Sequence, residues 1–197
     1  IETDALVRAA RGDRSSAVYF LERELETYAG SQIHKRLQKN ANLLSLAGQP
    51  APMLEAQEYL GEAPPSLDEL KGNVVLLFFW AHWCPDCKAQ VPAIEAALDK
   101  YRSQGLRVLA PTQRFGYIVN GQDAPPDQEL AHMAQVLDES YGVLSTEGVP
   151  VGPATHNRYG VSTTPTLVLV DREGIVRLYR PGNMSEDDLD AAIRELL

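Results

Sequence analysis

The sequence predicts an α/β sandwich, in which helices pack on the faces of a central sheet. The first observation is an uninterrupted apolar run at residues 74–80, rich in Val and Phe, which is typical of a strand buried on both faces. A helix that starts at Pro85 and a strand at residues 106–110 follow it and complete a right-handed βαβ unit. A hairpin within residues 166–179 precedes a terminal helix, which gives the sheet an antiparallel part.

A helical extension, residues 1–48, precedes this sandwich. Apolar residues recur at helical spacing in two stretches, separated by a break at Gly30, with Ser15 and Ser16 as candidate caps. We therefore expect two helices, with inner faces formed by Val18, Leu21, Leu25 and Tyr28 and by Ile33, Leu37, Ala41 and Leu44. They pack against the domain or space it from something upstream; a docking or dimerisation arm is the alternative.

The main domain, residues 49–197, starts with an extended, proline-rich segment up to residue 65. Ser66 and Glu69 have the spacing of a capping box, and Gly72 ends the helical turn that it starts. After the strand at residues 74–80, Pro85 is tolerable only in the first turn of a helix.

The helix from Pro85 extends to about residue 103, with a kink at Pro92, and Gly105 ends it. Residues 111–157 form a longer connection between two strands than an ordinary α/β domain requires at this point. Within them we expect a helix at residues 127–141, flanked by ordered loops at the sheet edge, residues 125–126 and 148–153.

The C-terminal part of the sequence predicts a strand, a turn, a second strand and a helix. Residues 166–170 are β-branched and apolar, residues 171–174 form a turn, and residues 175–179 return as an antiparallel strand. Ser185 then caps a helix that ends at Leu197, with acidic residues in its first turn, where the helix dipole favours them.

Composition excludes some classes of function. The 197 residues carry a formal net charge of −9, and the sequence pI is near 4.9. Nonspecific binding to nucleic acid or to anionic lipid is therefore not expected. No apolar stretch reaches the roughly 18 residues of a membrane span. The chain begins with Ile1 rather than Met, which leaves room for a signal or anchor before it.

Both cysteines lie in one motif, Cys84-Pro85-Asp86-Cys87, at the expected start of a helix. Free backbone N–H groups and the helix dipole favour a thiolate there, so Cys84 is expected to be the reactive cysteine. We expect Cys84 near the surface and Cys87 one turn in and more buried. Half of a zinc site is the alternative, with His82 as the only extra ligand nearby. The four histidines, however, lack the spacing of zinc ligands: His34, His82, His132 and His156.

Two stretches resemble the hallmarks of thioredoxin-like proteins. The first, with Pro92 five residues after it, is Phe79-Trp80-Ala81-His82-Trp83-Cys84-Pro85-Asp86-Cys87-Lys88. The second resembles the loop that carries a cis-proline before a strand, and reads Tyr159-Gly160-Val161-Ser162-Thr163-Thr164-Pro165-Thr166-Leu167-Val168-Leu169-Val170-Asp171. The domain start and the segment between the motifs look most like the TlpA/ResA-type thiol-disulfide oxidoreductases, or redoxins, of bacteria. The resemblance covers about residues 49–197.

This resemblance implies a thioredoxin-like three-layer α/β/α sandwich with a central mixed sheet, an inserted helical segment and an N-terminal helical extension. It implies dithiol–disulfide exchange with protein thiols and disulfides, in which Cys84 attacks and Cys87 resolves, with no cofactor besides their redox-active disulfide. It also implies a cis peptide before Pro165, which contacts the cysteine pair, and a Thr164 backbone free to pair with an extended substrate. The group commonly works outside the cytoplasm, so we expect the bacterial periplasm or another extracytoplasmic location.

Further residues around the motif have supporting roles in this interpretation. Trp83 shields one side of the cysteine pair and offers an apolar surface to the partner. His82 either tunes the thiolate or is a solvent-facing turn residue, and the sequence favours the second. Two acids that relatives carry are replaced here, by Phe78 and by Gln90, so Cys87 is expected to keep its proton to a higher pH.

Two other functions remain open at the level of sequence. A peroxiredoxin-type peroxidase is disfavoured, because relatives of that kind carry Thr or Ser three residues before the reactive cysteine, where this chain has Ala81. A copper or haem-pathway binding module would use the two cysteines as a ligand pair. The sequence does not identify the upstream redox partner.

Overall fold

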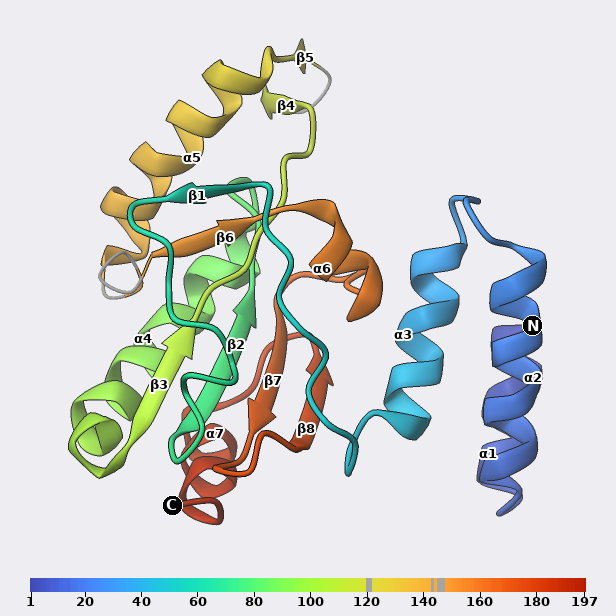
Figure 1. The fold of residues 1–197 in the computed structure, drawn as a ribbon. Helices are drawn as coiled ribbons and strands as arrows, with labels where there is room; N and C mark the ends of the chain where they lie inside the picture. The colour runs from blue at the N-terminus through green and yellow to red at the C-terminus, as the bar shows by residue number, and fades with distance from the viewer. Residues whose placement is uncertain (120–121, 143, 145–147) are drawn as a thin grey trace.

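A central mixed sheet organises the protein. The computed structural model describes residues 1–119, 122–142, 144 and 148–197. The sheet has the order β3-β2-β7-β8, with β2 parallel to β3 and the other neighbours antiparallel (Figure 1). Its strands are β2 (Val74–Phe79), β3 (Leu106–Leu109), β7 (Thr166–Val170) and β8 (Val176–Pro181). This confirms the predicted α/β class with a mixed sheet.

Side chains on both faces of β2 are buried, as its uninterrupted apolar sequence predicts. Alternate residues from Val74 to Phe78 face a core shared with α4 (Pro85–Tyr101), α5 (Pro126–Ser140) and α7 (Glu186–Arg194). The opposite face, from Val75 to Phe79, packs with Leu46, Leu70 and Tyr159. The ends of α4 and α7 are close to prediction: Arg102–Gln104 form a 3-10 turn before Gly105, and Ser185 caps α7 through the N–H of Asp188.

A separate two-stranded sheet contains two strands that the sequence did not reveal. β1 (Glu58–Leu60) lies in the segment expected to be extended, and β6 (Val149–Val151) lies where a loop was predicted. The two strands pair with each other antiparallel, and Thr112 forms a parallel bridge with Val151. Because each strand has only three residues and β6 contains Pro150, neither carries a readable alternation.

The insertion between β3 and β7 contains more structure than expected. α5 matches the predicted helix within one residue, and a short hairpin of β4 (Tyr117–Val119) and β5 (Gln122–Asp123) precedes it. α6 (Pro153–Arg158) follows β6 and was not predicted. Figure 1 shows α5 and the β4–β5 hairpin projecting beyond the upper end of the sheet.

The N-terminal extension has three helices in the structure, not two: α1 (Glu2–Ala10), α2 (Arg14–Thr27) and α3 (His34–Ser45). Asp13 caps α2 by accepting from the N–H of Ser16, so the predicted serine caps are wrong. The helices share a small core of their own around Leu21 and Leu37. Of these helices, α3 packs on the domain, against α6 and β8, as Figure 1 also shows.

The packing of α3 on the domain depends on Gly160. This glycine has a positive φ of 61°, and a Cβ there would lie 2.3 Å from the backbone nitrogen of Lys39. The backbone of α3 therefore rests directly on the segment that leads to the Thr164–Pro165 loop. No helix among the described residues is both long and apolar enough to cross a membrane.

Candidate functional site

The two cysteines form a disulfide at the N-terminus of α4. Cys84 is the N-cap, with extended backbone angles, and Pro85 is the first helical residue, as predicted. The sulfur of Cys84 accepts a hydrogen bond from the N–H of Cys87 at 3.0 Å. Cys84 is 2% exposed and Cys87 0%, so the expectation that Cys84 lies near the surface is wrong for the disulfide form: both cysteines are buried. What distinguishes the two is their position on the helix.

The loop before Cys84 is fixed to the end of the sheet. The indole N–H of Trp80 donates to the carbonyl of Ala110 at 2.9 Å, and the hydroxyl of Thr112 donates to the carbonyl of Trp80 at 2.8 Å. Trp80 itself is fully buried against Tyr141, with the ring centroids 4.6 Å apart. These contacts hold the ends of β2 and β3 together, so the cysteine pair starts from a rigid base.

The peptide bond between Thr164 and Pro165 is cis, as predicted. Thr166, the next residue, pairs with Phe79 in the register of β7 and β2, so this loop and the cysteine pair lie at the same end of the sheet. The Pro165 carbonyl accepts from the N–H of Gly182 at 2.8 Å. In the described part of the chain, the backbone N–H and carbonyl of Thr164 have no hydrogen-bond partner. Contact of Pro165 with either cysteine stays a prediction.

Trp83 and His82, which precede Cys84, differ in their exposure to solvent. Trp83 is 44% exposed, which leaves an apolar surface beside the disulfide. The favoured expectation for His82 is wrong: it is 3% exposed and does not face solvent. Its Nε2 lies 2.9 Å from the carbonyl of Tyr117. Because a carbonyl only accepts, Nε2 carries the proton in this bond, and Nδ1 is left with a free lone pair and no partner among the described residues.

Burial lowers the pKa of His82. The hydrogen bond to Tyr117 and the carboxylate of Glu129 act in the opposite direction, and His132 acts with burial. His82 is therefore a neutral imidazole near neutral pH, two residues before Cys84.

The two positions where relatives carry acids are both buried. Phe78 is fully buried, and its ring centroid lies 6.3 Å from that of Tyr141. Gln90 is 1% exposed, and its Oε1 accepts from the N–H of Met184 at 2.8 Å. Its Nε2 has no partner within the described residues. Asp86, between the cysteines, is exposed, as predicted.

The model of the protein family described as Redoxin matches residues 46–193. The chain belongs to the Redoxin family. Thiol-disulfide oxidoreductase ResA of Halalkalibacterium halodurans is 27% identical over 143 residues, which cover 73% of each chain.

Two solved structures resemble this redoxin. One, from Chlorobium tepidum, is described as a thiol:disulfide interchange protein DsbE; it is 28% identical, has a TM-score of 0.56, and aligns over 76% of this chain and 96% of its own. The other is the pneumococcal exposed lipoprotein thioredoxin of Streptococcus pneumoniae, at 25% identity and a TM-score of 0.53, covering 74% and 98%. Together with the disulfide, these likenesses establish the redoxin as a thiol-disulfide oxidoreductase with a thioredoxin-like fold.

Sequence reasoning missed four residues of the insertion that surround His82. The ring of His82 contacts Phe115, Tyr117 and His132, with centroids 5.7, 6.1 and 5.5 Å away. Glu129, from α5, accepts from the backbone N–H groups of residues 115 and 116. The available signal was weak: two aromatic residues flank Gly116, and one acid lies within an apolar helix face.

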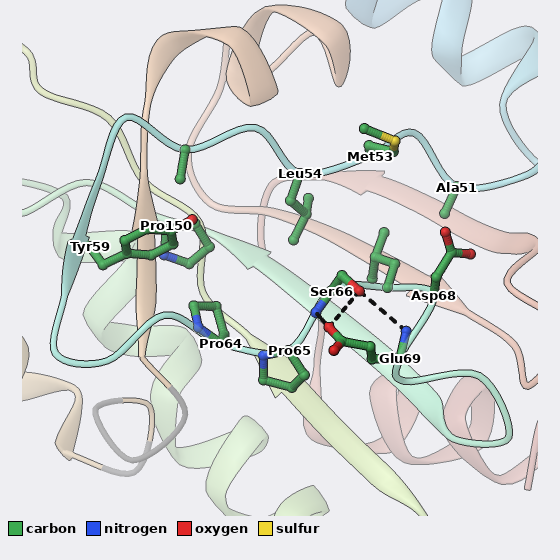
Figure 2. Close-up of a pocket in the computed structure, with 12 residues that line it drawn as sticks. Ala51, Met53, Leu54, Tyr59, Pro64, Pro65, Ser66, Asp68, Glu69 and Pro150 are labelled. Atoms are coloured by element: carbon green, nitrogen blue, oxygen red, sulfur yellow. Dashed lines mark hydrogen bonds between the residues drawn. The ribbon is translucent and has the colours of Figure 1, made fainter.

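A separate pocket of about 330 Å³ lies between the proline-rich leading segment and the capping box (Figure 2). None of the predicted site residues lines it. Ser66 and Glu69 form hydrogen bonds with each other through both backbone and side chain, which confirms the predicted capping box. The polar groups of these two residues, which line the pocket, are therefore already paired. Among the described residues, no group of three or more His, Cys, Asp and Glu side chains is arranged to hold a metal ion.

Proposed function

We propose that this redoxin exchanges disulfides with protein substrates through Cys84 as the attacking thiolate and Cys87 as the resolving thiol. The observation that carries this assignment is the N-cap position of Cys84, whose sulfur accepts the N–H of Cys87. In the reduced protein the same N–H and the positive end of the α4 dipole stabilise a negative sulfur at Cys84. Cys87 lies inside the helix, where its own sulfur lacks that arrangement.

The exchange takes place in two balanced steps. The Cys84 thiolate attacks one sulfur of a substrate disulfide; a Cys84–substrate bond forms, the substrate S–S bond breaks, and one substrate thiolate leaves. Cys87, after losing its proton, attacks Cys84, so the Cys84–Cys87 bond forms and the second substrate thiolate leaves. Two electrons pass from the protein dithiol to the substrate, and the reverse sequence oxidises a substrate dithiol. No group beyond this cysteine pair takes part.

The substrate side of the site consists of Trp83, Thr164 and Pro165. The unpaired backbone of Thr164 is available to pair with an extended segment of the substrate, in the manner of an added strand. The exposed face of Trp83 offers an apolar contact next to the attacking sulfur. Pro85 and Gln90 act behind the pair, Pro85 by starting α4 and Gln90 by filling the buried space one turn after Cys87.

We also propose that the protein works outside the bacterial cytoplasm, as the exposed pneumococcal lipoprotein does. Disulfide-bonded protein partners persist mainly in oxidising compartments outside the cytoplasm, which supports this location. Protease digestion of spheroplasts, which lack the barrier of an intact outer membrane, tests this: digestion without lysis of the cytoplasmic membrane is expected, and protection until lysis would contradict it.

Trapping of mixed disulfides tests the roles of the cysteines. With Cys87→Ser, attack by Cys84 has no following step, so a covalent complex with a disulfide-bonded substrate protein such as insulin should accumulate. Cys84→Ser should trap at least tenfold less, because its remaining thiol lies inside the helix rather than at the N-cap, where the N–H groups and the helix dipole favour a thiolate. Non-reducing gels and mass spectrometry measure both.

The double variant, with both cysteines replaced by Ser, is the control for noncovalent binding. Equal trapping by the two single variants would overturn the assignment of roles. Absence of any trapping or turnover in the parent protein would overturn the proposed function itself.

A further inference from the structure

An exposed aromatic surface adjoins the cysteine pair, and the insertion provides most of it. Phe115 and Tyr117 lie against Trp83, with ring centroids 5.3 and 6.3 Å from it; Phe115 meets it edge-on and Tyr117 stacks at 28°. These three residues are called the aromatic platform below. The two insertion rings are partly exposed, as is Trp83, and Val119 is 56% exposed just beyond them.

Buried polar groups fix the platform in place. The carboxylate of Glu129, 1% exposed, accepts from the N–H of Phe115 at 2.5 Å and from the N–H of Gly116 at 2.9 Å. Gly116 has a positive φ of 85°, which allows both N–H groups to point at one carboxylate. His82 donates to the Tyr117 carbonyl, so the loop before Cys84 holds the other side of the segment.

Burial of a carboxylate is costly unless several donors satisfy it. Glu129 has two backbone donors, and both belong to the platform segment. A loop that merely connects β3 to α5 would need no buried acid to fix its shape. The arrangement indicates that the position of the two rings relative to Trp83 matters.

We propose that the aromatic platform binds an apolar side chain next to the reacting cysteine of a substrate protein, and that Glu129 and His82 are positioning residues for it. This rests on the proposed function and adds the class of substrate segment that the site selects. The occupant is an extended segment, because the unpaired backbone of Thr164 lies at the same end of the sheet. Its flanking residue is apolar, because the platform consists of three aromatic rings, and none of them carries a charge near neutral pH.

The test uses two peptides, each a symmetric disulfide dimer, that differ only in carrying Phe or Ser beside the cysteine. The reduced protein reacts with each peptide to give the Cys84–Cys87 disulfide and two peptide thiols, which balances the two electrons. Second-order rate constants are measured in single turnover and divided by the constant for hydroxyethyl disulfide. The parent should prefer the Phe peptide about tenfold, the scale of one aromatic contact with its buried area.

Variants separate the platform from general effects. Tyr117→Ser should reduce the preference to about twofold, while Tyr117→Phe, which keeps the ring, should retain it. Tyr59→Ser is the control: Tyr59 is a 44% exposed tyrosine that lines the pocket of Figure 2 instead of the platform, and its replacement should leave the preference unchanged.

Glu129→Ala tests positioning. It should lower the preference at least as much as Tyr117→Ser does, and the double variant should lower it by less than the two single effects combined, because both changes act on the same platform. Glu129→Gln, which keeps one acceptor, should recover part of the preference. If Glu129→Ala does not fold, the Tyr117 variants still decide the proposal.

Equal rates for the Phe and Ser peptides in an active parent protein would overturn this inference and leave the proposed function intact. An unreactive parent would overturn the proposed function instead. A change of oligomeric state with Tyr117→Ser in sedimentation, at an unchanged preference, would identify the platform as a contact between copies and would also overturn the inference.

Discussion

Replacement of Gln90 by glutamate tests how the resolving cysteine loses its proton. Gln90 lies one helical turn after Cys87 on the same face of α4, and both side chains are buried. The N–H of Met184 fixes Oε1, and Nε2 has no partner among the described residues. With Gln90→Glu, one carboxylate oxygen can keep the bond to Met184, and the other replaces Nε2 in the buried space one turn from the thiol.

The expected gain follows from the ionisation of an ordinary thiol. A cysteine with an ordinary pKa of about 8.5 is only about 3% thiolate at pH 7, so full deprotonation raises the rate of resolution about 30-fold, and by more for a thiol whose pKa burial raises. A carboxylate in a dry space is a stronger base than an exposed one. We therefore expect Gln90→Glu to accelerate resolution about tenfold at pH 7, with the gain vanishing toward pH 9. Attack by Cys84 should stay nearly unchanged.

The same substitution carries a stability cost with a defined pH dependence. Burial raises the pKa of the introduced carboxyl above its unfolded value of about 4.3, so the unfolded chain loses that proton first as the pH rises. The variant should match the parent below about pH 4 and lose up to about 1.4 kcal/mol per pH unit between the unfolded and folded values. Urea denaturation at pH 4 and pH 8 measures the difference.

Stopped-flow single-turnover exchange, followed from pH 6 to 9, measures attack and resolution separately. Ala89→Glu is the control, because Ala89 is exposed on the same helix and receives the same charge outside the buried space. If resolution in the parent is already fast and independent of pH between 6 and 8, the reasoning is refuted. The free Nδ1 of His82 is then the base to examine.

Two further predictions concern stability. Gly160→Ala should destabilise the protein by more than about 2 kcal/mol in urea denaturation, because the new methyl would overlap the backbone of α3 at Lys39; a loss below 0.5 kcal/mol would contradict this packing. Burial, reinforced by the charge of Lys35, lowers the pKa of His156 to about 3. As the pH falls below about 6.5, this histidine therefore becomes protonated in the unfolded chain but stays neutral in the folded chain. Stability should therefore fall by about 1.4 kcal/mol per pH unit from this group, and His156→Phe should remove that slope.

The fold was largely predictable because its central elements carry strong local signals. Three local patterns each predict one structure: the apolar run of β2, the proline that starts α4, and the cap of the terminal helix. β1 and β6 were missed because they are short and are defined by pairing with each other across nearly a hundred residues. α1 was missed because its buried face consists of one residue, Ala5, which gives no periodic pattern.

In the candidate site, the cysteine motif and the cis bond before Pro165 were predicted from the sequence. The burial of His82 was not, because neighbours along the chain do not determine it. Spacing from Cys84 places the imidazole in a turn, and a turn residue usually faces solvent. The aromatic residues that cover it come more than thirty positions later, in the insertion.

The insertion therefore completes the active-site loop. His82 is buried because Phe115, Tyr117 and His132 pack around its ring, and Glu129 holds the turn between the first two. The same contacts set two rings against Trp83, whose exposed face adjoins the attacking sulfur. A substitution of Glu129 in α5 would thus have two effects. It would change the surroundings of His82, the only buried imidazole beside the cysteines in the described chain, and it would change the surface that meets the substrate. On this argument, an insertion of this kind lets redoxins with the same cysteine motif differ in the substrates they select.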